Sequence, residues 1–325
     1  MEFDANDRFY ADFETRFRGS RSSVLHRLEG YLPLLAPLQK HITSFSALDL
    51  GCGRGEWLEL LQTQGITARG VDLNRAQLEQ CKKLNLSVNH NDAITELRSA
   101  EDGSETLITA FHLVEHLPEK AVRQLIEEAL RVLIPGGLLI LETPNPDNLS
   151  VGSNSFYLDP THQCPIPALR LQFLVENTGF EDAHILRLNH DPALKEQETI
   201  RLIDVIRGAS PDYAVIAIKS GVPHLNEALK RNAKGYEGVS VQALCNKFDQ
   251  QQQQLKEQQQ SLEQQQSRFK VQLDQFENSQ KEYQDLLQQE QHNIRMLLES
   301  SSWRLTKPFR QLKNSLRNLS KKAIK

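Results

Sequence analysis

A glycine-rich segment near residue 50 constrains the fold of this 325-residue chain more than any other feature. In LDLGCGRGEW, residues 48–57, an apolar run leads into three glycines at alternate positions, Gly51, Gly53 and Gly55. This order predicts a strand, a tight turn and a helix N-terminus, because glycine adopts backbone angles closed to other residues and lets a ligand approach bare backbone. The N–H groups of the first helical turn then favour a polar or anionic ligand group.

An acidic residue after the next predicted strand indicates what the turn binds. That strand, 67–72, ends in Asp72. A carboxylate in this position accepts hydrogen bonds from both hydroxyls of a ribose. A dinucleotide fingerprint would need glycine at position 56, where this chain has Glu56. The two segments therefore predict a nucleoside site of another kind.

Strands and helices alternate from residue 46 to about residue 220. We predict strands at 46–50, 67–72, 86–90, 106–111, 137–142, 183–189 and 213–219. Helices are predicted at 56–64, 74–84, 92–99, 118–132, 166–178 and 195–207. This alternation indicates a Rossmann-like α/β domain, a seven-stranded parallel sheet with helices on both faces. Ligands of such sheets bind at the carboxyl ends of the strands, where the strand order reverses.

The whole chain is too long for one ordinary domain. We predict five segments: an N-terminal helical segment at 1–45, the α/β domain at 46–220, a linker at 221–240, a coiled coil at 241–300 and a basic amphipathic tail at 301–325.

The coiled-coil prediction depends on an apolar residue at every seventh position: Phe248, Leu255, Leu262, Phe269, Phe276 and Tyr283. A low-complexity disordered tract is the rival interpretation, because 18 glutamines lie between Asp249 and His292. Glutamine is a good helix former and the apolar period is unbroken, so we favour a coiled coil. It would join copies of the chain into a dimer or trimer and act as a spacer.

The C-terminal residues are strongly basic. From Arg295 to Lys325 there are nine Lys or Arg residues and one acid, in a chain whose net charge is −4. Four apolar residues recur on one helical face among them: Phe309, Leu312, Leu316 and Leu319. Such a helix suits an anionic membrane surface or an acidic partner helix, with a solvated terminal helix as the alternative. The acidic body is not expected to bind nucleic acid.

Other patterns indicate a cytoplasmic protein, peripheral on the inner face of the inner membrane. The first ten residues lack the basic region and apolar core of a secretory signal. No run approaches the ~20 apolar residues of a membrane span. The four cysteines lie apart, without C-x-x-C spacing, so we predict neither a disulfide framework nor a metal site.

Five ordered motifs resemble those of class I S-adenosylmethionine-dependent methyltransferases. They are the glycine turn, the acid after the second strand, NDA at 91–93, FHLVEHLP at 111–118 and IPGGLLILETPN at 134–145. The resemblance implies S-adenosyl-L-methionine as the cofactor. The implied cofactor-binding residues are Asp49, Gly51, Gly53, Gly55, Asp72, Leu73, Asp92, Ala93, Phe111, His112 and Arg18. Asp92 equally suits the cap of the following helix, and the two roles are compatible.

Three histidines are the candidate catalytic residues. Methyl transfer is an in-line displacement that depends on positioning, and a general base helps when the acceptor is a hydroxyl. His112 closes the fourth predicted strand, and His116 suits either catalysis or an anchor for the turn that follows. His162 lies in a long polar loop after Thr143, which we expect to form a lid without regular structure.

Four residues are predicted to bind the acceptor. Arg16 and Arg21 lie with Arg18 around Gly19, and these guanidinium groups suit the cofactor carboxylate or an anionic acceptor. A solvated helix end is the alternative. Tyr157 and Asp159 in the predicted lid complete the set.

Several segments together look like a narrower family. FRGSR, DLGCGRGEWLELL, FHLVEHLP, LILETPNP and FYLDPTHQ resemble the methyltransferase domain of bacterial O-antigen chain-terminating enzymes, over about residues 8–190. The resemblance implies methylation of the non-reducing terminal sugar of a polysaccharide acceptor. It also implies a coiled coil that acts as a ruler and a glycosyltransferase or polymerase partner for the C-terminal region.

One departure from that family bears on the acceptor. Some members carry a kinase-like domain before the coiled coil, but this chain has no H-R-D or D-F-G signature. Direct O-methylation of a sugar hydroxyl is therefore expected, unless a separate kinase supplies a phosphate. The alternatives are a methyltransferase for a small metabolite such as a quinone precursor, and a coiled-coil scaffold whose head senses a nucleoside.

Overall fold

The computed structural model describes residues 9, 13 and 16–322, and only the backbone of residues 317–322. The chain forms two compact units, one up to Gln251 and one from Gln252 onward. Much of the first third of the predicted N-terminal segment, residues 1–8, 10–12 and 14–15, lies outside the described residues.

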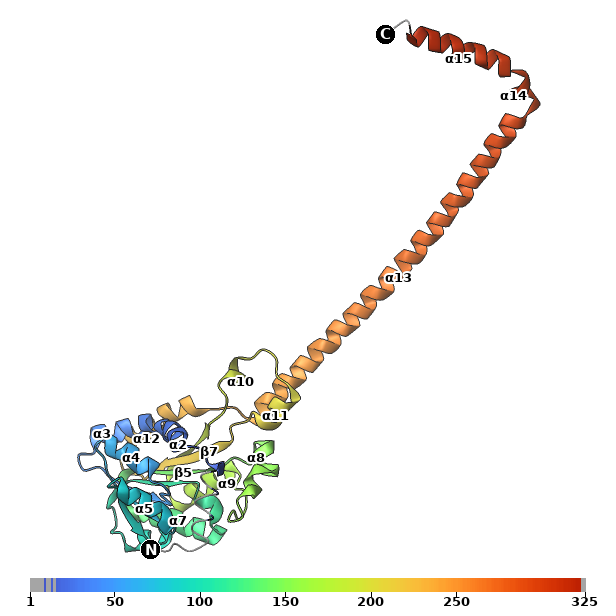
Figure 1. Cartoon of the computed structure of the whole chain (residues 1–325). Helices are drawn as coiled ribbons and strands as arrows, with labels where there is room; N and C mark the ends of the chain where they lie inside the picture. The colour runs from blue at the N-terminus through green and yellow to red at the C-terminus, as the bar shows by residue number, and fades with distance from the viewer. Residues whose placement is uncertain (1–8, 10–12, 14–15, 323–325) are drawn as a thin grey trace. The chain divides into compact units, whose positions relative to one another are not determined.

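A seven-stranded sheet forms the centre of the first unit (Figure 1). Its strands are β1 (Ser46–Leu50), β2 (Thr67–Asp72), β3 (Ser87–His90), β4 (Glu105–Phe111), β5 (Leu133–Pro144), β6 (Glu181–Leu188) and β7 (Asp212–Ile218). The order β3-β2-β1-β4-β5-β7-β6 places the reversal between β1 and β4. The predicted seven-stranded α/β fold is confirmed.

The sheet is mixed, and the expectation of a wholly parallel sheet is wrong at one strand. β1 to β5 run parallel to one another, whereas β7 is antiparallel to both β5 and β6. Residues 189–211 join the adjacent ends of β6 and β7. A parallel pair would instead need a crossover from one end of the sheet to the other.

Helices cover both faces of the sheet. They are α2 (Arg21–Glu29), α3 (Leu32–His41), α4 (Glu56–Thr63), α5 (Arg75–Lys83), α6 (Ala93–Ser99), α7 (Glu119–Val132), α8 (Leu149–Ser153), α9 (Ala168–Thr178), α10 (Ala193–Glu196), α11 (Leu202–Arg207) and α12 (Pro223–Ala233), with short 3-10 turns η1 (Val114–His116), η2 (Ser155–Leu158) and η3 (Lys234–Tyr236). Alternate strand residues face opposite layers: Leu139 packs with α7 and α9, and its neighbour Leu138 packs with α3 and α12.

Two predicted segments have more structure than expected. The polar loop after Thr143 contains α8 and η2, because the Asn148 side chain accepts hydrogen bonds from two N–H groups of the first turn of α8. We call residues 145–165 the lid. The predicted helix 195–207 is two helices, α10 and α11, and Asp204 Oδ2 in the first turn of α11 accepts a hydrogen bond from the Arg201 N–H at the start of that helix.

The predicted linker at 221–240 belongs to the globular unit instead. Leu225 and Leu229 of α12 are each 1% exposed and pack against the sheet. Val239, and Leu244 near the start of the next helix, are buried in one small apolar cluster with Ile200. The i,i+4 spacing of Leu225 and Leu229 places both on one helical face, which explains why this segment docks.

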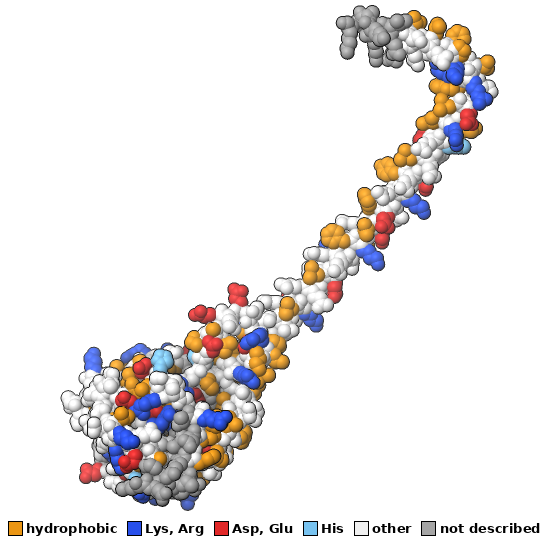
Figure 2. All heavy atoms as spheres, in the orientation of Figure 1, with side chains coloured by type: hydrophobic (Ala, Val, Ile, Leu, Met, Phe, Trp, Pro, Cys, Tyr) orange, Lys and Arg blue, Asp and Glu red, His pale blue; other side chains and the backbone are white. Residues whose placement is uncertain are grey.

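The second unit is helical. It consists of the later part of α13 (Val241–Glu299), with α14 (Ser301–Leu305) and α15 (Lys307–Lys322). Hydrophobic side chains recur along α13 (Figure 2), and those of the heptad are exposed, for example Leu262 at 58% and Phe276 at 60%. The helix prediction is confirmed, and association through this seam stays a prediction. None of the described helices has the length and apolar character that crossing a bilayer requires.

Candidate active site

The glycine turn has the backbone conformation that the sequence predicts. Gly51, Gly53 and Gly55 have φ values of +70°, +52° and +76°, in the left-handed region that other residues rarely adopt. A Cβ atom on Gly55 would lie 2.7 Å from Leu86 Cδ1 and 2.9 Å from Cys81 Sγ. The turn therefore has no room for a side chain there, and it presents bare backbone where β1 ends and α4 begins.

Asp72 holds the end of β2 to this turn. Its Oδ2 accepts a hydrogen bond from Gly53 N–H at 2.9 Å, and its Oδ1 accepts one from Asn74 N–H at 2.7 Å. Each carboxylate oxygen has two lone pairs, so these bonds are compatible with binding a ribose hydroxyl. Leu73, the next residue, is 61% exposed beside the turn.

Asp92 caps α6, one of the two roles that the sequence left open. Its Oδ1 accepts hydrogen bonds from the N–H groups of Ile94 and Thr95, each at 3.0 Å. Because these backbone bonds fall on Oδ1, the geometry leaves Oδ2 for an adenine amino group. Ala93 is buried at the start of the same helix.

Opposite charges lie at the first glycines. Asp49 is 3% exposed and accepts a hydrogen bond from Thr109 Oγ1 at 2.7 Å. Burial raises the pKa of Asp49 to about 7, against the opposing effects of the Thr109 bond and the Arg18 charge. Arg18 Nη1 lies 3.3 Å from the place a Cβ atom would occupy on Gly53. Together the two side chains match the ammonium and carboxylate groups of an amino acid.

The other two arginines are placed differently. Arg21 donates to Glu59 Oε2 through Nε and Nη2 and to the Arg54 carbonyl through Nη1, at 2.5–3.2 Å. These bonds fasten α2 to α4, which gives Arg21 a structural role, and its predicted contact with the acceptor stays a prediction. Arg16 is exposed, with its guanidinium carbon 5.6 Å from the centroid of the Phe17 ring, and its predicted contact with the acceptor stays a prediction.

His112 lies where β4 ends, at the reversal of strand order. It has φ of +55°, an uncommon conformation for a non-glycine residue. Its Nδ1 donates to Glu115 Oε1 and its Nε2 to Glu142 Oε1, both at 3.1 Å. Burial alone would lower the pKa of His112, but the bonds to these carboxylates outweigh it and raise the pKa to about 10. The predicted role as general base does not fit a ring whose two nitrogens both face carboxylates.

Sequence reasoning missed three residues of this acidic cluster: Tyr31, Glu142 and Asp212. Tyr31 OH donates to Glu142 Oε2, and burial with the Glu142 charge raises the pKa of Tyr31 well above its usual range. Asp212 Oδ1 lies 3.9 Å from His112 Nε2. Glu142 lies within the LILETPN motif and could have been found there. The other two have no local signal.

Phe111, predicted to contact the cofactor, packs in an aromatic group behind the turn. Its ring centroid lies 5.1 Å from that of Tyr31 and 5.3 Å from that of Trp57. All three are buried. Phe111 therefore supports the site from within the core.

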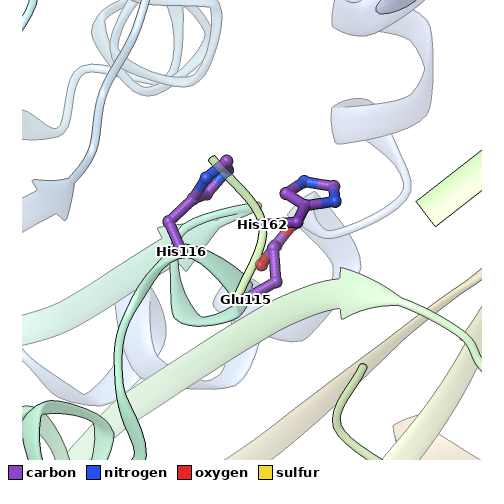
Figure 3. Close-up of side chains that lie close together, drawn as sticks. All are labelled: Glu115, His116 and His162. Atoms are coloured by element: carbon purple, nitrogen blue, oxygen red, sulfur yellow. The ribbon is translucent and has the colours of Figure 1, made fainter. Parts of the chain in front are cut away.

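A second cluster joins the lid to η1. Glu115 and His116 from η1 lie next to His162 from the lid (Figure 3). One potential ligand atom from each residue lies within 4.8 Å of those of the other two. Gln163 N–H donates to the Glu115 carbonyl at 2.8 Å, which pins the lid here. The structure thus brings together two of the three predicted catalytic histidines.

The lid orients both imidazoles. His162 Nδ1 donates to the Phe156 carbonyl at 2.6 Å. Thr161 Oγ1 donates to Asp159 Oδ1 at 2.6 Å and accepts from His116 Nδ1 at 2.8 Å. Asp159 therefore orders the lid, and its predicted acceptor contact stays a prediction.

Tyr157, the other predicted acceptor ligand in the lid, is 63% exposed, and its contact with an acceptor also stays a prediction. A cavity of about 340 Å³ lies between the segment that follows β6 and the segment that precedes β7. Its polar lining includes Asn189, Asp191, Arg201 and Arg207. Asn189 Nδ2 donates to Asp212 Oδ2 at 2.7 Å, which ties the cavity to the acidic cluster.

Comparisons with known proteins agree with this geometry. Residues 17–185, just over half of the chain, match the model of the methyltransferase domain family. A probable S-adenosylmethionine-dependent methyltransferase of Mycolicibacterium smegmatis is 30% identical over 151 residues, covering 46% of this chain and 57% of the relative. A ubiquinone biosynthesis O-methyltransferase of Paraburkholderia xenovorans is 32% identical over 111 residues, covering 32% and 47%. The chain thus spans about half the length of these relatives.

A solved structure extends the match. The S-adenosylmethionine-dependent methyltransferase of Archaeoglobus fulgidus superposes with a TM-score of 0.58 and 32% identity, covering 65% of this chain and all of that one. The glycine turn, Asp72 and all seven strands except the last lie wholly or largely within the residues that match the family model. The chain belongs to the methyltransferase domain family and is an S-adenosyl-L-methionine-dependent methyltransferase.

Proposed function

We propose that this methyltransferase O-methylates the non-reducing terminal sugar of a bacterial surface polysaccharide, a lipopolysaccharide O-antigen. The observation that carries the proposal is α13. A 59-residue helix with an exposed apolar heptad follows directly on the catalytic body. An enzyme for a small metabolite has no need of such a helix, whereas a chain terminator can use it as oligomeriser and length ruler.

The acidic cluster favours a hydroxyl acceptor over a phosphate. Glu115, Glu142 and Asp212 surround the single imidazole of His112. Carboxylates outnumber cations there, and like charges at short range repel an anion. The adjoining polar cavity offers amide, carboxylate and guanidinium groups, which match the hydroxyls of a sugar.

The chain's own residues position the reaction. When bound, S-adenosylmethionine would supply an electrophilic methyl group on a sulfonium, and the residues that would hold it are the glycine turn, Asp49, Arg18, Asp72 and Asp92. The acceptor hydroxyl oxygen would bond to the methyl carbon as the carbon–sulfur bond breaks, with that bond's electron pair staying on sulfur. The hydroxyl proton is released. His116 and His162 are the residues placed to assist that release, while His112 positions the carboxylates.

The C-terminal region supplies the partners in this proposal. The heptad of α13 joins two or three chains, and the basic amphipathic α15 binds an anionic membrane surface, the inner face of the inner membrane. Side chains described in α15 support this: Phe309 and Leu312 are 77% and 67% exposed, close to Arg310 and Lys313. A membrane-bound polymerase partner then meets the catalytic body at the growing chain.

The test uses synthetic oligosaccharides that end in the repeat unit of the producing strain. Full-length protein with S-adenosylmethionine should add one methyl group to the non-reducing terminal sugar, detected by mass spectrometry. Deletion of residues 252–325, which leaves the globular unit whole, should keep methylation in the tube but lose length control in cells. Methylation restricted to small phenols would contradict the proposal.

A small-molecule acceptor is the second candidate. It is favoured by the 32% identity over 111 residues with a ubiquinone biosynthesis O-methyltransferase. A catechol acceptor assayed beside the oligosaccharides separates the two candidate functions, because the true class of acceptor should give much the higher kcat/KM.

A further inference from the structure

We propose that Glu115, His116 and His162 bind a divalent transition-metal ion between η1 and the lid. The three side chains come from two segments more than 40 residues apart and lie close together (Figure 3), and each offers one potential ligand atom. This site is additional to the cofactor pocket, and the sequence alone predicted no metal ligands.

The distances suit an ion with little rearrangement. The three atoms lie within 4.8 Å of one another. Ligands held at about 2.1 Å from one ion are separated by roughly 3–3.5 Å, so a closure of about 1–2 Å completes the set. Rotation of the side chains in the partly exposed His116 and His162 supplies movement on that scale, while Glu115 is fully buried and fixed.

The second layer of contacts matches that of a metal site. A histidine that ligates a metal usually donates its other ring N–H to a carbonyl or a carboxylate, which fixes the tautomer. His162 Nδ1 donates directly to the Phe156 carbonyl. His116 Nδ1 donates to Thr161 Oγ1, which passes the bond to Asp159. In both rings Nε2 is therefore the ligating nitrogen.

The donor set selects the ion. Two imidazoles and one carboxylate suit Zn²⁺, Co²⁺, Fe²⁺ or Ni²⁺, whereas Mg²⁺ and Ca²⁺ prefer oxygen ligands throughout. Three protein ligands leave at least one position for water or an acceptor oxygen. Asp159 Oδ2 lies 3.9 Å from His162 Nε2 and is a further oxygen close to the three residues.

The ion would replace a general base in methyl transfer, a role that rests on the proposed function. An acceptor hydroxyl bound to the ion loses its proton more readily, as bound water does. The proton passes to solvent water and the oxygen keeps the electron pair that attacks the methyl carbon. Binding of the ion itself does not depend on the identity of the acceptor.

The binding test uses untagged full-length protein, stripped with a chelator and titrated with Co²⁺ in the absence of cofactor and acceptor. We expect one Co²⁺ per chain, with visible d–d absorption, and no comparable binding of Mg²⁺. His116→Ala and His162→Ala should weaken Co²⁺ binding more than about 100-fold, and Thr161→Val, which loses only an orienting bond, about 10- to 100-fold.

His26→Ala is the matched control, because His26 is a histidine with an 86% exposed side chain on α2, outside the cluster. It should bind Co²⁺ as the wild type does. Retained binding of S-adenosylmethionine shows that each variant is folded. Wild-type affinity in His116→Ala and His162→Ala would overturn the site, as would absence of Co²⁺ binding or a preference for Mg²⁺.

Catalysis is measured separately. If Co²⁺ binds as expected but no oligosaccharide is methylated, the site stands and the proposed acceptor fails. If methylation proceeds equally in chelator and in Co²⁺ while the binding variants behave as expected, the site stands and its activating role is overturned.

Discussion

Replacing Asp49 with Asn should stabilise the protein without cofactor and weaken its binding of cofactor. Asp49 is nearly fully buried where β1 ends, and burial raises its pKa from 3.8 to about 7. Thr109 and Arg18 oppose this shift, whereas Asp72 and Glu56 add to it. An Asn side chain has the same shape and still accepts the Thr109 hydrogen bond, but it carries no charge.

The sign of the expected stability change follows from the direction of the Asp49 pKa shift. Because the folded-state pKa is raised, the stability that Asp49 contributes is fully present below about pH 3.8 and is lost as the pH rises to about 7. Three pKa units correspond to about 4 kcal/mol. Asp49→Asn should therefore have little effect near pH 4 and raise the free energy of unfolding by about 2–4 kcal/mol at pH 8.

Cofactor binding should change in the opposite direction. An ammonium group beside the ionised carboxylate would stabilise its charge, so wild-type affinity for S-adenosylhomocysteine should rise from pH 5 to pH 8. Asp49→Asn should bind more weakly, by about tenfold or more at pH 8, with a flat pH profile, since about 1.4 kcal/mol of lost interaction is tenfold.

Urea unfolding followed by the fluorescence of buried Trp57 measures stability, and calorimetry measures binding, at pH 4 to 8. Asp102→Asn is the matched control, because the Asp102 side chain is 81% exposed. It should leave both profiles unchanged. A difference in stability between wild type and Asp49→Asn that does not grow with pH would refute the reasoning.

Three further predictions concern the turn, the acidic cluster and the coiled coil. Gly55→Ala should destabilise the protein by more than about 2 kcal/mol and abolish cofactor binding, because Gly55 has a φ of +76° and a Cβ atom there has no space. Cofactor affinity equal to that of the wild type in calorimetry would contradict this. Tyr31→Phe removes the donor to buried Glu142 and should cost about 1–3 kcal/mol in urea unfolding, and an unchanged midpoint would argue against the bond. Leu273 lies four residues after Phe269, on the same helical face as the heptad. Leu273→Glu should convert an oligomer to monomers in sedimentation analysis, while Val271→Glu, on another face, should not.

Sequence periodicity predicted the strands well, because each strand is decided by its own residues and by the turns that bound it. The glycine turn and Asp72 were also predictable, since the residues that form them are close in the chain. The direction of β7 was not, because it depends on which end of the sheet the chain returns to after β6. Docking of α12 was missed for the same reason: Leu225 is buried only because distant helices meet it.

The acidic cluster shows the limit of local reasoning most clearly. Tyr31 and Glu142 are 111 residues apart in sequence and are joined by one buried hydrogen bond. Asp212 reaches them through the antiparallel pairing of β7 with β5, which sets it opposite Pro144. A sequence motif specifies a carboxylate at the end of β5. It does not say that the carboxylate will be shared between a tyrosine and a histidine.

His112 links the two halves of the site. It ends β4 beside the cofactor turn, and its ring binds Glu115, whose neighbour His116 belongs to the cluster with His162. The left-handed backbone of His112 turns the chain sharply from β4 into η1. His112 therefore faces Glu142, while His116 in η1 faces His162. A histidine in this position therefore acts by holding Glu142 and Glu115 apart and in place. In the proposed reaction, chemistry on the acceptor then falls to His116 of η1 and His162 of the lid, which are partly exposed.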